Sequence, residues 1–425
     1  MTKRKYLYLS VSMVALAGGM SEALAGGFAL REQSAYYQGM SFAGNAAGGA
    51  SISSIFWNPA TVTNTIGLTF ESHSSLIAPE ATITPDAATR TTITGFGGSG
   101  NDSGDMANDA WIPASYTGYQ IDESWYLGLA INSQFGLATK AGPAWSGQTF
   151  ARTSEVFSVN VNPMIGYKVN DMLSLAVGMQ FQYFDVRLTS ATGLPAGSGT
   201  AALKGDDIGF GFTAGLLFTP MEGTDIGVGY RSAIFHDLDG DFSTPVAVGP
   251  LPAGTYGIST RMATPDMVTL SAKQRITDTF RVMGTVEWTN WSRLKEPSVV
   301  LDAGAQLRTL PFNYDDSWFF SVGAEYDWNE KLTLRAGAAY ELSPIDEDIR
   351  SLRLPDDDRI WLSAGLSYKP MEHLSFDFAY SHLFSANDTK VNIDPNHQDY
   401  NGVFTYRGNV DSSVNIVSAS MRYTW

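Results

Sequence analysis

The side chains able to act as a nucleophile, a base or a metal ligand lie far apart in this chain. Cysteine is absent, and the five histidines are His73, His236, His373, His382 and His397. Hydrolysis needs a nucleophile with a placed base, and no Ser-His pattern or cluster of metal ligands surrounds these histidines. The glycine-rich stretch 95–100 lacks the lysine of a phosphate-binding loop. We therefore predict no catalytic residue, no metal and no cofactor.

A different group of residues is suited to holding a hydrophobic molecule. Residues 26–65 are rich in Gly, Ala and Ser and have no clear period, yet they include Phe28, Leu30, Tyr36, Tyr37, Phe42, Ile55, Phe56 and Trp57. A flexible tail seldom carries so many large apolar side chains. Near the end of the segment, Asn58-Pro59-Ala60 predicts a stiff turn, because proline fixes its own φ and keeps Asn58 out of the helical region. The segment is therefore expected to fold against other elements.

The first 25 residues have the pattern of an export signal. A basic start at residues 3–5 precedes a mostly apolar stretch, and Ala23-Leu24-Ala25 resembles a cleavage site. The mature chain is then expected to begin at Gly26. Since no later stretch approaches about 18 apolar residues, the sequence predicts no transmembrane helix. An exported chain of this kind is either secreted or an outer-membrane barrel.

The elements that must position the apolar segment alternate apolar and polar residues. Near the end of the chain, Val417, Ala419, Met421, Tyr423 and Trp425 fall on one side of such a strand, with polar residues between them. The pattern recurs at residues 66–78, 111–121, 124–136, 153–168, 172–189, 206–219, 224–241, 264–276, 279–291, 317–328, 331–343, 358–369, 373–384 and 413–425. Short turns alternate with longer polar connections, which is typical of an up-and-down barrel. We predict an all-β fold: a 14-stranded antiparallel transmembrane β-barrel over residues 66–425.

The free-energy cost of placing a charged side chain in lipid indicates which face of each strand meets the membrane. Arginine at the lipid midplane costs about 2–4 kcal/mol, so we expect inward-pointing side chains at Arg335, Glu287, Glu325 and Asp377. A barrel of this width leaves space that wall side chains cannot fill. We predict that residues 26–65 form a hatch, or plug, inside the lumen. A periplasmic extension that docks elsewhere is the alternative.

The charge of the chain excludes one class of partner. The formal net charge is -16, and it becomes -18 without residues 1–25, which hold three basic residues and one acidic residue. Nucleic acid is bound by basic surfaces. We therefore predict no nucleic-acid partner.

Motifs spread along the chain resemble one family. They are Gly27-Phe28-Ala29-Leu30-Arg31-Glu32, Asn58-Pro59-Ala60, Trp111-Ile112-Pro113, Phe135-Gly136-Leu137-Ala138-Thr139, Gly229-Tyr230-Arg231-Ser232, Thr289-Asn290-Trp291-Ser292 and the stretch 354–365. Together they closely resemble the outer-membrane long-chain fatty-acid transporter family (FadL type), which includes aromatic-hydrocarbon transporters. The resemblance covers the whole chain after the leader.

The resemblance implies a mechanism and a set of residues. It implies passive transport of hydrophobic molecules by lateral diffusion, through a wall opening at a kinked third strand. The implied substrate-binding and hatch residues are Phe28, Leu30, Asn58, Pro59 and Ala60, and the implied strand kink lies at Gln134, Phe135 and Gly136. A glycine inside a strand pattern independently indicates a bulge or bend.

The implied partners are hydrophobic small molecules, either long-chain fatty acids or, as the alternative within the family, small aromatic hydrocarbons. Connection 190–205 offers no clear basic residue for a carboxylate, and Arg187 and Lys204 are the nearest candidates. We expect a monomer in the outer membrane of a Gram-negative bacterium, in contact with lipid and lipopolysaccharide. A general aqueous porin is the alternative of a different class, disfavoured because a porin needs no apolar N-terminal segment. An outer-membrane phospholipase or protease is disfavoured by the histidine pattern.

Overall fold

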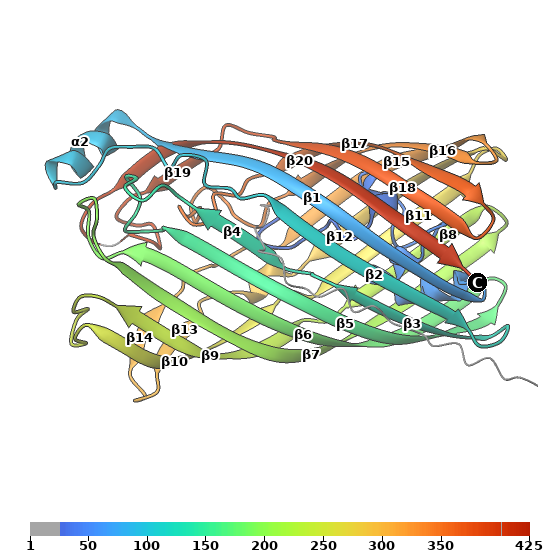
Figure 1. Ribbon diagram of the computed structural model, residues 1–425, viewed down its shortest axis with the longest axis horizontal. Helices are drawn as coiled ribbons and strands as arrows, with labels where there is room; N and C mark the ends of the chain where they lie inside the picture. The colour runs from blue at the N-terminus through green and yellow to red at the C-terminus, as the bar shows by residue number, and fades with distance from the viewer. Residues whose placement is uncertain (1–25, 401) are drawn as a thin grey trace, which may run out of the picture.

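A closed antiparallel barrel of 14 wall strands forms the protein (Figure 1). The computed structural model describes residues 26–400 and 402–425, so the predicted leader at residues 1–25 lies outside the described residues. The wall strands are β1 (Leu68–Pro85), β2 (Ala110–Gln120), β3 with β4 (Trp125–Asn132 and Gly136–Lys140), β5 (Thr153–Asn170), β6 (Leu173–Ala191), β7 (Thr200–Met221), β8 with β9 (Thr224–Arg231 and Ile234–Thr244), β10 with β11 (Gly254–Thr264 and Met267–Arg275), β12 (Phe280–Thr289), β15 (Ser317–Asn329), β16 (Leu332–Leu342), β17 (Arg359–Met371), β18 (Leu374–Ser385) and β20 (Tyr406–Thr424).

Smaller elements precede the barrel or belong to its connections. They are α1 (Ala35–Gln38), η1 (Ile52–Phe56), η2 (Pro59–Asn64), α2 (Ala87–Gly95), η3 (Trp291–Arg293), β13 (Ser298–Leu301), β14 (Gln306–Thr309) and β19 (Lys390–Ile393). Among the described residues, no helix combines the length and the apolar character that crossing a membrane requires.

The barrel closes because the first wall strand joins the last. Strand β1 pairs with β2 on one side and with β20 on the other, from Thr69↔Thr424 to Pro85↔Gly408. Closure satisfies the backbone hydrogen bonds of both strands, which an open edge within lipid could not do. The predicted fourteen-stranded barrel is confirmed.

Several strands run further into the loop side than predicted. The prediction ended the seventh wall strand at residue 241 and began the eighth at 264, whereas β9 continues to Thr244 and β10 begins at Gly254. Strand β7 likewise begins at Thr200, inside the predicted connection 190–205. These extensions are rich in Gly, Ser and Thr, so their alternation is weak. They are held by pairing with a neighbouring strand, as in Gly254↔Thr244.

The two faces of the wall differ as predicted. Val417, Met421 and Trp425 are exposed on the outside, whereas Ser418 and Ser420 are buried. The charged residues predicted to point inward are all buried as well: Arg335, Glu287, Glu325 and Asp377. The alternation of side chains along each strand therefore separates a lipid-facing surface from a polar interior.

Residues 26–65 pack against inward-facing side chains of the wall, and Figure 1 shows this segment in blue within the outline of the barrel. The Ser41 hydroxyl donates to the hydroxyl of Ser363, and the Gly44 N–H donates to the hydroxyl of Thr285. At Gly229 a Cβ would collide with the carbonyl group of Trp57. The segment therefore contacts the wall on several strands, and at Gly229 only glycine permits the approach.

Buried charges join this segment to the wall. The Nε of Arg335 lies 2.7 Å from Oε2 of Glu325, and its Nη1 lies 3.6 Å from Oδ1 of Asp377. The hydroxyl of Tyr36 donates to the same Oε2 of Glu325 at 2.7 Å. Removing one partner from such a group leaves the others as uncompensated buried charges.

We expect the substitution Arg335→Met to destabilise the barrel by about 3–5 kcal/mol, because Asp377 would lose its buried cation and Glu325 would keep only Arg281. The temperature at which the detergent-solubilised protein loses its folded gel mobility measures the effect. Arg261→Met is the matched control, since Arg261 and its partner Asp237 are both largely exposed and such pairs contribute about 0–1 kcal/mol. Equal losses in the two variants would contradict the expectation.

Candidate functional site

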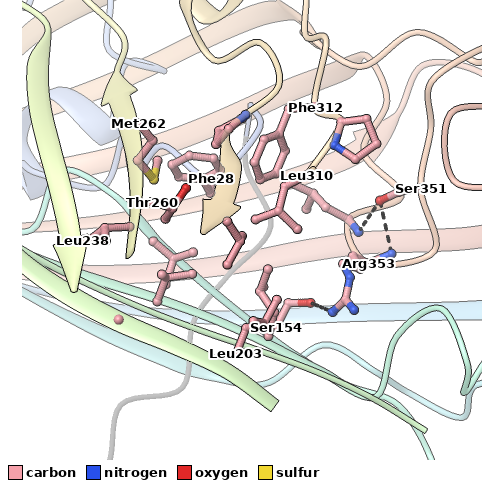
Figure 2. A pocket seen from close by; sticks show the side chains of 18 of the residues that line it. Phe28, Ser154, Leu203, Leu238, Thr260, Met262, Leu310, Phe312, Ser351 and Arg353 are labelled. Atoms are coloured by element: carbon pink, nitrogen blue, oxygen red, sulfur yellow. Dashed lines mark hydrogen bonds between the residues drawn. The ribbon is translucent and has the colours of Figure 1, made fainter. Parts of the chain in front are cut away.

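An apolar pocket lies beside the start of the N-terminal segment (Figure 2). Its walls include the large apolar side chains of Phe28, Leu203, Leu238, Met262, Leu310 and Phe312. These residues come from the N-terminal segment, from β7, β9 and β10, and from the connection after β14. Concave sites with mostly apolar walls and a few polar groups suit apolar or lipid-like ligands.

Phe28 lies at the centre of an aromatic cluster beside this pocket. Its ring meets Trp291 edge-on with centroids 4.7 Å apart, and it meets Phe135 in the same way at 5.8 Å. The ring of Phe184 lies 6.4 Å from that of Phe28. Edge-to-face aromatic contacts of this kind add about 0.5–1.5 kcal/mol each to apolar burial. The cluster therefore holds the beginning of the N-terminal segment against the pocket.

The third wall strand is interrupted next to Phe28. Strand β3 ends at Asn132 and β4 begins at Gly136, and we call residues 133–135 the third-strand break. The ladder between β2 and β3 ends at Ser115↔Ile131. Strand β2 itself continues to Ala110 and stays paired with β1 there. In the described structure, residues 110–114 of β2 therefore have no register partner in β3 or β4.

The N-terminal segment pairs with the break. The Leu30 N–H donates to the carbonyl oxygen of Gln134, and the Gly136 N–H donates to the carbonyl oxygen of Phe28, both at 2.9 Å. A bridge joins Ala29 to Phe135 between these two bonds. The interrupted stretch thus takes backbone partners from residues 28–30, which an unbroken third strand would take from β2.

A second, more polar pocket adjoins the break. Leu30, Gln134 and Phe135 line it. Arg31 also lines it, with Nη1 2.6 Å from Oε1 of Glu287 and Nη2 3.3 Å from Oε1 of Glu341. These buried ion pairs fix the chain direction immediately after Phe28.

The Asn58-Pro59-Ala60 motif lies elsewhere. The side chain of Asn58 caps η2 by accepting the Ala60 N–H, and its Nδ2 donates to the carbonyl oxygens of Ala46 and Leu216. Pro59 begins the helix, a position where its missing N–H leaves no intrahelical bond unmade. The structure thus brings Phe28 and Leu30 to the predicted kink residues, and it sets this motif against β7.

Two basic residues of the pocket were missed by sequence reasoning. Arg308 from β14 and Arg353 from the connection before β17 both line it. Figure 2 shows Arg353 at the edge of the apolar side chains, where its Nη1 donates to the Ser154 hydroxyl at 3.4 Å. Within the described residues, neither guanidinium has a carboxylate oxygen within 4 Å. Nothing local in the sequence distinguishes these arginines from solvated loop charges.

Desolvation shifts the pKa values of these groups, although both guanidinium groups stay charged at neutral pH. It lowers the pKa of Arg353 to about 10, with repulsion from Arg308 acting in the same direction. Burial also lowers the pKa of Arg308, which an attraction to Asp399 partly offsets. The pKa of Asp399, which lines the same pocket, is raised by burial. The pocket therefore holds cations that an anionic ligand would stabilise.

The two basic candidates named from the sequence have other partners. Lys204 lines the pocket, but its Nζ lies 3.3 Å from a carboxylate oxygen of Asp241. Arg187 pairs with Glu155 at 3.5 Å, and both side chains are nearly half exposed. Such exposed pairs are rim charges.

Comparison with known proteins agrees with this architecture. A long-chain fatty acid transport protein of Escherichia coli O6:H1 is 27% identical over 420 residues, which cover 90% of this chain and 92% of the relative. The crystal structure of a Pseudomonas aeruginosa FadL homologue has a TM-score of 0.83 at 22% identity and covers 94% of this chain and 99% of its own. That of the Ralstonia pickettii toluene transporter TbuX has a TM-score of 0.67 at 19% identity, covering 91% and 97%.

These two likenesses to crystal structures show the fold. The family assignment comes from the sequence: the model described as outer membrane protein transport protein (OMPP1/FadL/TodX) matches residues 16–425. That match includes residues 26–65 and every wall strand of the described structure. The chain therefore belongs to the OMPP1/FadL/TodX family of outer-membrane transport proteins.

Proposed function

We propose that this protein carries hydrophobic molecules across the outer membrane by lateral diffusion through its wall. The observation that carries the proposal is the missing ladder between β2 and the third-strand break, directly beside an apolar pocket. A ligand in the pocket would pass the break and enter the membrane sideways. Pocket and break lie within one chain, so a monomer suffices.

Transport from water into the bilayer needs no energy source. Each methylene group that leaves water gains roughly 0.8 kcal/mol, so passage from water into the bilayer is favourable for an apolar molecule. The barrier is the polar lipopolysaccharide surface. A pocket that opens at the side of the barrel provides a path around it.

Residues 26–65 act as the hatch in this proposal. They block the direct aqueous path, and their first residues close the side path by pairing with Gln134 and Gly136. Two backbone bonds, the aromatic contacts of Phe28 and a hydrogen bond from the Gln33 side chain to the carbonyl oxygen of Ser133 hold that closure. A ligand that displaces the Phe28 ring from the pocket would loosen the pairing and open the break.

The pocket favours a long apolar chain that ends in a carboxylate. Relatives of this chain are named for long-chain fatty acids and for toluene, and both kinds of molecule fit apolar walls. Arg308 and Arg353 distinguish them, because a cation in the pocket wall with no carboxylate oxygen within ion-pair distance gains from an anionic ligand and gains nothing from toluene. We therefore propose long-chain fatty acids as the substrate class.

Arg353→Met tests this assignment. A hydrogen bond to a charged group contributes about 1.5–3 kcal/mol, so oleate is expected to bind the purified detergent-solubilised variant at least about tenfold more weakly. Titration with oleate measures the change, and uptake of toluene by cells that carry the variant is expected to stay unchanged. Arg187→Met is the control, since that side chain lies outside the pocket. Unaltered oleate binding would shift the proposal to neutral aromatic hydrocarbons.

A further inference from the structure

The wall contains another interruption, between β7 and the split seventh wall strand. Strand β7 pairs with β9 as far as Asp206↔Asp239, and its pairing with β8 begins at Thr213↔Arg231. In the described structure no register pair joins residues 207–212 to residues 232–238, and we call these two stretches the β7–β9 seam. The β6–β7 ladder continues past the seam, and the β9–β10 ladder runs along it as far as Ile234↔Thr264. Residues 234–238 therefore stay paired with β10 where their register pairing with β7 is lost.

Hydrogen bonds at its two ends hold the seam together. At one end the Ser232 N–H donates to the carbonyl oxygen of Phe212 at 2.9 Å, the one backbone bond between residues 207–212 and 232–238 in the described structure. The hydroxyl of Ser232 accepts the Phe212 N–H at 2.8 Å. At the other end, Oδ2 of Asp207 accepts the Asp237 N–H at 3.2 Å and lies 3.1 Å from Nδ1 of His236. A side chain can rotate away from its partner without moving a strand, whereas a ladder bond cannot. Apart from the backbone bond between Ser232 and Phe212, side-chain contacts that can be exchanged therefore hold the ends of the seam.

Between these contacts, two positions of β7 carry no side chain on the inner face of the wall. Gly209 and Gly211 present no side chain there, and a Cβ on Gly209 would collide with the side chains of Ile234 and His236. Both of these side chains are buried. Ile234 and His236 therefore close the seam from inside, in space that the glycines leave free.

The inner face of the seam adjoins the apolar pocket. The ring of His236 stacks on Phe184 with centroids 5.1 Å apart, and Phe184 lines the pocket together with Gly205 and Leu238. The Nε2 of His236 lies 3.1 Å from Oε1 of Gln182. Pocket and seam are thus separated by one layer of side chains.

The outer face of the seam is apolar. Ile208, Phe210 and Phe235 point away from the barrel, and each is more than half exposed, at 60%, 63% and 55%. In a membrane these side chains meet lipid tails. A molecule that leaves the pocket between Ile234 and His236 would therefore enter an apolar environment.

We propose that the β7–β9 seam is a second lateral port of the apolar pocket, which passes apolar chains between pocket and membrane when Ile234 and His236 swing aside. The proposal rests on the proposed function, because it adds a route to the same pocket. When the third-strand break is blocked, the barrel is therefore expected to keep a residual uptake of apolar molecules, and this uptake should depend on the seam.

A disulfide across the seam tests the port, since the chain has no other cysteine. A Cβ on Gly211 would lie 2.7 Å from Oγ of Ser232, so Gly211→Cys with Ser232→Cys suits a disulfide. The pair is placed in a Gly136→Trp background, and uptake of labelled oleate is measured in a deletion strain under oxidising and reducing conditions. Phe218→Cys with Ile226→Cys is the matched control, because these residues are register partners in the paired part of the same strands.

The port predicts that oxidation of the seam pair lowers the residual uptake to that of the empty strain and that reduction restores it. Oxidation of the control pair is expected to leave uptake unchanged. Residual uptake that persists after complete oxidation, or its absence in Gly136→Trp alone, would overturn the port while the proposed function stands. A wild-type chain that takes up no oleate would instead overturn both.

Ile234→Ala in the Gly136→Trp background tests the port without an engineered disulfide. Removing the larger side chain of the two that close the seam is expected to raise the residual uptake above that of Gly136→Trp alone. The folded gel mobility of the variant checks assembly. A folded Ile234→Ala barrel with unaltered uptake would count against the port.

Discussion

Deletion of residues 26–60 is expected to turn the barrel into a leaky pore. A barrel of 14 strands has a lumen that its wall side chains do not fill, and the deleted segment holds Tyr37, Phe42 and Trp57, each almost fully buried. Single-channel conductance of the purified protein in planar bilayers is expected to rise by roughly tenfold or more, since the wider barrels leave an aqueous channel when nothing fills them. Ion flow would then replace selective passage of apolar molecules.

The same deletion removes the partners of buried wall charges. Glu325 loses the hydroxyl of Tyr36, and Glu287 loses Arg31. We therefore expect the deleted barrel to unfold at a lower temperature as well. The full-length chain is the control, and it should show no steady open pore. A large steady conductance in the full-length chain would contradict the hatch and favour the general porin.

Gly136→Trp is expected to slow the uptake of hydrophobic substrate by about tenfold, which corresponds to about 1.4 kcal/mol of added barrier. Gly136 is buried at the edge of the third-strand break, where its N–H bonds to the carbonyl oxygen of Phe28. An indole at this position is expected to obstruct the opening beside residues 110–114 of β2. Initial rates of labelled oleate uptake in a deletion strain measure the effect.

Ala336→Trp is the control for this substitution. Ala336 lies on the exposed face of β16, so an added indole meets lipid and leaves the interior unchanged. Both variants should reach the outer membrane in a folded form. Wild-type uptake rates in a folded Gly136→Trp barrel would argue against the side opening.

The sequence was sufficient to predict the wall. Alternation such as that from Val417 to Trp425 can be recognised locally, because the face on which a side chain lies depends only on whether its position in the strand is odd or even. The cost of charge in lipid then set the orientation of Arg335 and Asp377. The ends of β9 and β10 were predicted less well, since outside the lipid both faces are polar and the period fades.

The candidate site was only partly accessible from the sequence. Phe28, Leu30 and Gly136 were named through a family resemblance, and the structure places them together. The arginines of the pocket and the β7–β9 seam carried no such signal. Arg353 lies in a connection that reads as solvated loop, and the split at Ser232 lies within a run predicted as one strand.

What the sequence alone determined is the barrel with its two faces and a segment too apolar to remain free. The tertiary structure alone decided where that segment meets the wall. Phe28 and Trp291 are 263 positions apart in the sequence, yet their rings are in contact. Such contacts depend on the curvature of the closed wall and on which strands lose their pairing, and no local pattern of residues encodes either property.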